Sequence, residues 1–160
     1  MDVRSTYDGL KTFKFGDSAE LADRLAALVV AGVKTATCSA ATHGPDAVVG
    51  ERQVCLDGAD APVCEIQTTE MQTLPFEYVT PEMAALEGEG DLSYRYWREA
   101  HQAYFQREGT WASNMEVIFE TFRVTRILDD AFAKHAPDVV KVERAEAQAN
   151  GYTALGAHHG

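Results

Sequence analysis

A lysine followed by alternating hydroxyl side chains is the strongest candidate for chemistry in this chain. In the stretch "AGVKTATCSAAT", Lys34 follows a helix-ending Gly32 and precedes Thr35, Thr37 and Ser39. A lysine in a dry pocket loses part of the hydration that stabilises its charge, so it can act as a base or as an electrostatic stabiliser beside a hydroxyl nucleophile. The alternative is structural, because a cation just beyond a helix C-terminus interacts favourably with the helix dipole.

Strand alternation limits how this stretch can form a site. In a regular strand Lys34 shares one face with Cys38, whereas Thr37 and Ser39 point to the opposite face. Lys34 and Thr37 can therefore line one pocket only if Lys34 still lies in the turn, or if a bulge separates the two residues.

The acidic segment "LEGEGD" is the second candidate. It carries Glu87, Glu89 and Asp91, and its glycines allow close approach of the backbone to a ligand. These carboxylates are suited to general acid–base catalysis or to binding a cation, and the alternative is a solvated loop between helices. The longer spacing of a calcium-binding loop is absent, and the histidines show no ligand spacing. We therefore predict no metal site, although a divalent cation is compatible with the carboxylates and no motif requires a cofactor.

An aromatic and basic helix is the third candidate. Aromatic rings and cations in "SYRYWREAHQAYFQREG" are suited to stacking on bases and contacting phosphates of single-stranded nucleic acid. Trp97 and Tyr104 lie on the apolar stripe and are expected to pack in the core. The exposed remainder is Arg95 or Arg98 with His101, and Arg98 and His101 are predicted to bind substrate.

The segment "GTWASNMEV" offers a hydroxyl and an amide before the final strand. Ser113 and Asn114 can contact a ligand at the sheet edge, or they can form a turn, which is the commoner use of these residue types.

The elements that must position these residues follow from periodicity and capping signals. A helix is predicted after Asp17 or Ser18, because an apolar stripe continues to Val29 and Gly32 provides a left-handed stop. The remaining predictions are a strand at 34–39, a hairpin of strands at 52–56 and 63–71, and a long strand at 115–128. Two further helices are predicted, one capped by Thr80 and one capped by Asp91 or Ser93 and stopped by Gly109. This order predicts an α+β domain whose antiparallel strands curl around one core.

Length, composition and charge limit the number of domains and the classes of partner that this chain can have. The chain has 160 residues, enough for one domain, and its formal net charge of −11 opposes long-range attraction to nucleic acid. Three cysteines without CxxC spacing are expected to be reduced core residues, and neither a membrane span nor a signal peptide is apparent, so a cytoplasmic protein is expected. Residues 1–130 are predicted to form the domain. Residues 131–160, rich in alanine and charge, are predicted to be a loose helix or a disordered tail.

Four segments in order resemble the bacterial ASCH (ASC-1 homology) domain proteins. They are "FGDSAELADRLAALVVAGVKTATCS", "VCEIQTTEMQTLPFEYVT", "EGEGDLSYRYWREAHQAYF" and "NMEVIFETFRV", and the likeness extends from Phe13 to Ile127. The resemblance implies a PUA-like fold, a small twisted β-barrel with surrounding helices. It also implies a cleft beside the first helix-to-strand junction and RNA or modified nucleosides as partners.

The resemblance also implies roles for individual residues. Amidohydrolase members that cleave N4-acetylcytidine use a lysine, a threonine three residues later and a loop glutamate, which correspond to Lys34, Thr37 and either Glu89 or Glu87. Ribonuclease-like members imply Lys34 with a serine before the last strand, here Ser113. The residues expected to bind substrate are Thr35, Ser39, Glu87, Arg98, His101 and Asn114.

Three functions follow from this resemblance. The first expectation is a ribonuclease that cleaves single-stranded RNA, with Lys34 stabilising charge on the scissile phosphate. The second is the amidohydrolase, which has the direct match at Lys34 and Thr37. The third is a noncatalytic RNA-binding module. The acidic net charge counts against tight binding of long RNA and favours a small ligand.

Overall fold

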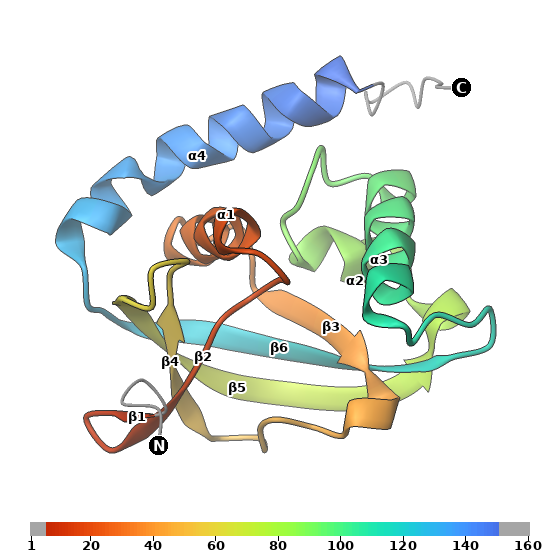
Figure 1. Cartoon of the computed structure of the whole chain (residues 1–160), viewed down its shortest axis with the longest axis horizontal. Helices are drawn as coiled ribbons and strands as arrows, with labels where there is room; N and C mark the ends of the chain where they lie inside the picture. Colours follow the sequence, from red (N-terminus) through yellow and green to blue (C-terminus); the bar gives the residue numbers. More distant parts are fainter. Residues whose placement is uncertain (1–5, 151–160) are drawn as a thin grey trace.

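The chain folds into a mixed α+β domain with helices against one twisted sheet (Figure 1). The computed structural model describes residues 6–150. The elements are β1 (Thr6–Tyr7), β2 (Leu10–Phe13), α1 (Ala19–Val30), β3 (Ala36–Ala40), η1 (Ala41–His43), β4 (Arg52–Leu56), β5 (Pro62–Pro75), η2 (Phe76–Tyr78), α2 (Pro81–Leu86), α3 (Tyr94–Glu108), β6 (Glu116–Ile127) and α4 (Asp130–Ala149). The predicted α+β class is confirmed, and the predicted elements occur in the predicted order, but β1 and β2 before α1 were not predicted.

The sheet has six strands in the order β1-β2-β4-β5-β6-β3. All neighbours are antiparallel except β2 and β4, which are parallel, and β4 with β5 forms the predicted hairpin. Register shifts between β5 and β6, at Glu65/Ile66 and Thr68/Glu70, add twist to the long strands. In Figure 1, β2 and β4 run across the direction of β5 and β6. Within residues 6–150, β1 and β3 are the two ends of the strand order and do not pair with each other, so the sheet is twisted but not closed into a barrel.

Helix α1 is followed by a short turn that leads into β3. The Ser18 side chain caps it by accepting a hydrogen bond from the amide of Leu21 at 3.1 Å, and Gly32 turns the chain with φ +85°. The amide of Lys34 then donates to the carbonyl of Leu28 at 3.1 Å, within the turn that follows the helix. Because β3 begins at Ala36, Lys34 precedes the strand, which is one of the two arrangements that alternation allows.

Two capped helices enclose the acidic loop. Thr80 caps α2 and Ser93 caps α3, each accepting a hydrogen bond from an amide three residues later, as the sequence predicts. Gly109 ends α3 in the left-handed conformation with φ +85°. The segment 87–93 between these helices carries the predicted carboxylates, so both of its ends are fixed by the capped helices.

Two apolar clusters pack on the sheet. One joins α3 to β3 and β6 through stacked and edge-on rings, including Phe76, Trp97 and Phe105, and the other packs α1 on β4 and β5. The cysteines Cys38, Cys55 and Cys64 are free thiols within these clusters. Two separate clusters hold the helices apart, which leaves room for a cavity between them.

The segment after Asp129, expected to be a loose helix or a disordered tail, is helical over most of its described part. Residues 130–149 form the continuous helix α4, capped by Asp129 and packed along α1. It packs through small residues such as Ala136 and Ala147, which is how a segment with few large apolar side chains can pack against α1. The rest of the predicted tail, residues 151–160, lies outside the described residues. Neither α4 nor any other helix within residues 6–150 is long and apolar enough to cross a membrane.

Candidate functional site

A cavity of about 950 Å³ lies between the two helical sides of the domain. Its walls come from β2 and α1 on one side and from β3, β6 and α3 on the other. Six of the residues predicted from sequence line it, namely Lys34, Thr37, Ser39, Glu87, Glu89 and His101. The helix-to-strand junction and the acidic loop, which are distant in sequence, therefore meet in one site.

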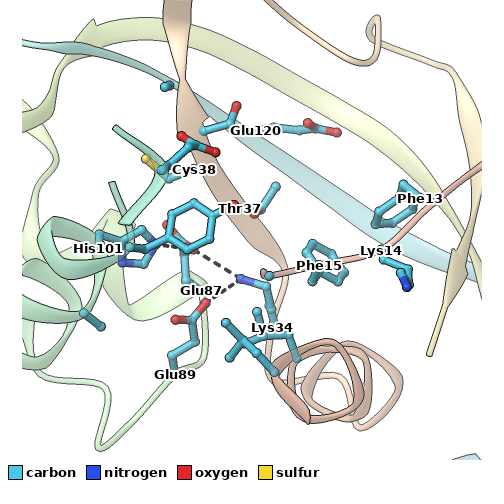
Figure 2. Close-up of a pocket in the computed structure, with 18 of the residues that line it drawn as sticks. Phe13, Lys14, Phe15, Lys34, Thr37, Cys38, Glu87, Glu89, His101 and Glu120 are labelled. Atoms are coloured by element: carbon cyan, nitrogen blue, oxygen red, sulfur yellow. Dashed lines mark hydrogen bonds and ion pairs between the residues drawn. The ribbon is translucent and has the colours of Figure 1, made fainter. Parts of the chain in front are cut away.

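Lys34 is buried at the centre of this site, with 1% of its side chain exposed. Its ammonium group donates hydrogen bonds to Glu89 Oε2 at 2.8 Å, to Glu87 Oε1 at 3.2 Å and to the carbonyl of Ala36 at 2.9 Å. Figure 2 shows Lys34 directed between these two carboxylates, with Phe15 beside it. All three ammonium protons have acceptors, so the burial of this cation is compensated.

Glu87 connects Lys34 to α3. Its Oε2 accepts a hydrogen bond from the indole of Trp97 at 2.7 Å, and its Oε1 lies 3.2 Å from His101 Nε2. The other ring nitrogen of His101 lies 2.9 Å from the carbonyl of Trp97. His101 is therefore buried in the polar cluster, and the expectation that it is exposed on α3 was wrong, because its position on the helix faces Glu87 rather than solvent.

Opposite charges decide the protonation of this cluster. Burial alone lowers the pKa of Lys34, but Glu89 and Glu87 outweigh it and raise the pKa above its ordinary value. Burial opposes the charge on Glu87 too, yet His101 and Lys34 lower its pKa to about 2. Burial likewise disfavours a charged His101, but Glu87 raises its pKa to about 8. At neutral pH the ligand-free site thus holds a charged lysine rather than a free amine base.

The same acidic and imidazole groups have the composition of a metal site. Glu87, Glu89 and His101 each offer one possible ligand atom, a carboxylate oxygen or a ring nitrogen, and these three atoms lie within 4.8 Å of one another. However, the Lys34 ammonium is hydrogen-bonded to both carboxylates and supplies the positive charge that a metal would bring. The donors suit a divalent cation such as zinc only if Lys34 is displaced.

Thr37 faces the cavity from β3 and is paired across the sheet with Glu120 on β6. Glu120 Oε2 accepts a hydrogen bond from Thr68 at 2.6 Å. Burial, with smaller contributions from nearby carboxylates, raises the pKa of Glu120. Among residues 6–150, no hydrogen-bond partner is found for the Thr37 hydroxyl or for Glu120 Oε1, so both can serve a ligand.

Four of the predicted site residues do not line the cavity. Thr35 donates to the carbonyl of Leu86 at 3.3 Å, and Arg98 pairs with Glu77 at 3.4 Å on the outer side of α3. Ser113 and Asn114 are exposed in the turn before β6. Thr35 adjoins the lining residue Lys34, and Arg98 shares α3 with His101, so proximity in sequence suggested these two. No lining residue lies in the turn of Ser113 and Asn114.

Other residues that form the site were not identified from the sequence. Glu120 reaches the site only through the pairing of β3 with β6, and Phe15 places its ring 5.4 Å from Lys34 Nζ. Trp97 was assigned to the core, and it does pack there, but its indole also holds Glu87. The alternation of polar and apolar residues in β6 was the one available signal for Glu120.

The fold and the buried ion cluster define a PUA-like α+β domain with a cleft at its first helix-to-strand junction. The family model of the ASCH domain matches residues 11–126, and the chain belongs to this family. The structure of an ASCH domain from Lactobacillus crispatus JV V101 is similar, with a TM-score of 0.67 and 31% identity over 72% of this chain and 79% of that one.

A second solved structure, of a protein from Enterococcus faecalis V583, is also similar. Its TM-score is 0.65 with 29% identity, and the match covers 74% of this chain and 82% of the other. No curated protein matches this chain in sequence. The comparisons therefore establish the family and the fold.

Proposed function

We propose that this ASCH-domain protein hydrolyses an amide on a small modified nucleoside such as N4-acetylcytidine. The observation that carries the proposal is that Lys34, Thr37 and Glu89 line one cavity, whereas Ser113 of the ribonuclease-type set lies outside it. The cavity volume, about 950 Å³, is also in the range of small-molecule sites.

The charge of the cavity supports a small ligand over a phosphate chain. Eight carboxylate residues line it, namely Glu20, Asp46, Glu87, Glu89, Glu108, Glu120, Glu143 and Glu146. The lining cations Lys14, Arg24 and Arg107 are already paired with acidic side chains. Because phosphate binding depends on available lysine and arginine side chains, the lining disfavours RNA and favours a neutral nucleoside.

The proposed reaction assigns each group a role that its contacts allow. Glu89 takes a proton from a water molecule as that water attacks the acyl carbon, and the charged Lys34 stabilises the negative charge that develops on the carbonyl oxygen. The C–N bond then breaks, the leaving amine receives the proton from Glu89, and the acyl group leaves as a carboxylic acid. The Thr37 hydroxyl hydrogen-bonds the acyl group and orients it.

Glu120, paired with Thr37 across β3 and β6, completes the proposed site. Its free Oε1 is suited to accept a hydrogen bond from an N–H of the base, as carboxylates do from the N4 group of cytosine. This contact would orient the base while Lys34 and Glu89 act on its acyl substituent.

The experiment compares N4-acetylcytidine with a labelled single-stranded RNA, followed by chromatography of the products. We expect acetate and cytidine from the wild type, and loss of the reaction in Thr37→Val and Lys34→Ala. Thr35→Val, outside the cavity, is the matched control and should retain activity. Absence of deacetylation in the wild type overturns the proposal. RNA cleavage that is lost in Lys34→Ala would support the ribonuclease instead, and binding without turnover would support the RNA-binding module.

A further inference from the structure

The loop that carries both site glutamates is held in an unusual backbone conformation. Gly88 and Gly90 have φ values of +72° and +61°, which side chains rarely adopt. A Cβ on Gly88 would lie 2.3 Å from the carbonyl oxygen of Val33, and one on Gly90 would lie 2.3 Å from the ring of Tyr96. The loop is therefore pressed against the turn before β3 on one side and against α3 on the other.

Helix α4 contacts the same loop through its backbone. Arg144 Nη1 donates to the carbonyl oxygens of Gly88 and Gly90, at 2.7 Å each. The amide of Gly90 in turn donates to Glu143 Oε2 at 2.8 Å. Three hydrogen bonds between the loop and the adjacent helix residues Glu143 and Arg144 thus fix the peptide groups on both sides of Glu89.

A second contact ties this arrangement to α1. Arg24 Nη1 lies 2.8 Å from Glu143 Oε1 and 2.9 Å from Glu146 Oε1. Glu143 is buried, so its carboxylate is shared between Arg24 and the Gly90 amide with little competition from water. Helix α1 also leads into the turn that carries Lys34. The contacts of α4 with α1 and with the 87–91 loop therefore help to position both Lys34 and Glu89.

We propose that α4 is a positioning element of the site, in which Arg144 and Glu143 hold the 87–91 loop so that Glu89 reaches Lys34. The match to the ASCH domain ends at residue 126, so this helix adds to the matched region. Isolated left-handed glycines have no helix or sheet ladder to maintain them, and the guanidinium supplies fixed donors for two carbonyls. The inference rests on the proposed function only where activity is the readout.

The test compares Arg144→Met with Lys141→Met, an exposed position on the same helix. Amide hydrogen exchange of residues 87–91 and the NMR titration of His101 are measured in both. We expect Arg144→Met to speed exchange of the hydrogen-bonded amides of Gly88 and Gly90 by about 10-fold or more and to lower the pKa of His101, which Glu89 helps to raise. Lys141→Met should match the wild type, and Arg144→Lys should restore part of the protection.

Glu143→Gln is the second variant, and it should speed exchange of the Gly90 amide even if Arg144→Met does not fold. If the folded variants show the same amide exchange rates and the same His101 pKa as the wild type, the inference is overturned, whether or not the protein hydrolyses any amide. If the wild type is active, kcat should fall about 10-fold in Arg144→Met with KM little changed, and an unchanged kcat also overturns it. Failure of the wild type to hydrolyse amides, by contrast, counts only against the proposed function.

Discussion

One carboxylate oxygen, Glu87 Oε1, lies 3.2 Å from both Lys34 Nζ and His101 Nε2. Lys34 lies in the turn before β3 and His101 on α3, so this oxygen joins the two helical sides of the cavity. Each cation lowers the energy of the buried carboxylate, and the carboxylate does the same for both cations. The stability of the domain and the charge state of its site are therefore coupled.

Replacing Glu87 should expose this coupling. Glu87→Gln keeps the shape of the side chain but leaves two buried cations with less compensation, so we expect a loss of about 3–5 kcal/mol in the free energy of unfolding. Urea denaturation measures this loss, and NMR titration should show a lower pKa for His101. Glu82→Gln, exposed in the first turn of α2, is the control and should change neither. Equal stability of the two variants would contradict the role of Glu87.

The pH dependence of stability follows from His101. Its pKa is raised from 6.5 to about 8, so its contribution is fully present below pH 6.5 and is lost as the pH rises through 8. The shift corresponds to about 2 kcal/mol at the rule of 1.36 kcal/mol per pKa unit. Urea denaturation between pH 6 and 9 should show this loss in the wild type and not in His101→Gln. A parallel pH dependence in the two proteins would refute the assignment.

At low pH the dependence of stability on pH comes from Glu87 and has the opposite sign to that of His101. The pKa of Glu87 is lowered from 4.5 to about 2, so its contribution is present above pH 4.5 and is lost as the pH falls towards 2. We expect the wild type to lose more stability than Glu87→Gln in this window, again by urea denaturation. If both proteins lose the same amount, other carboxylates account for acid unfolding.

Lys34 should exclude metal ions from the site. Chelators should leave wild-type activity unchanged, whereas Lys34→Ala leaves Glu87, Glu89 and His101 free to bind zinc. Added zinc is expected to raise the unfolding temperature of Lys34→Ala but not that of the wild type, and calorimetry would measure the affinity. Tight zinc binding by the wild type would show that the lysine does not fill the cation position.

Glu120 should affect substrate binding more than turnover. Glu120→Gln replaces an acceptor-only carboxylate by an amide, and we expect KM for the nucleoside to rise about 10-fold with kcat little changed, in line with the 1–3 kcal/mol of a base contact. Glu116→Gln, exposed at the start of β6, is the matched control. Equal KM values for the two variants would remove Glu120 from the site.

Local signals in the sequence located most of the elements. Ser18, Thr80 and Ser93 act as the predicted caps, and Gly32 and Gly109 end their helices, because capping depends on neighbours within a few residues. The sequence left a loose helix and a disordered tail open for the segment of α4, since the partners that hold this helix lie on α1 and on the 87–91 loop, far away in sequence.

The sequence by itself determined the family, the order of elements and Lys34 as a candidate, through residue types, spacing and resemblance. Only the tertiary structure decided which groups meet Lys34. It brought Glu87 and Glu89 to Lys34 from more than 50 positions away, buried His101 beside them and paired Thr37 with Glu120. The physical reason is that charge compensation in a buried site depends on distances across the fold, and strand register and helix packing set those distances.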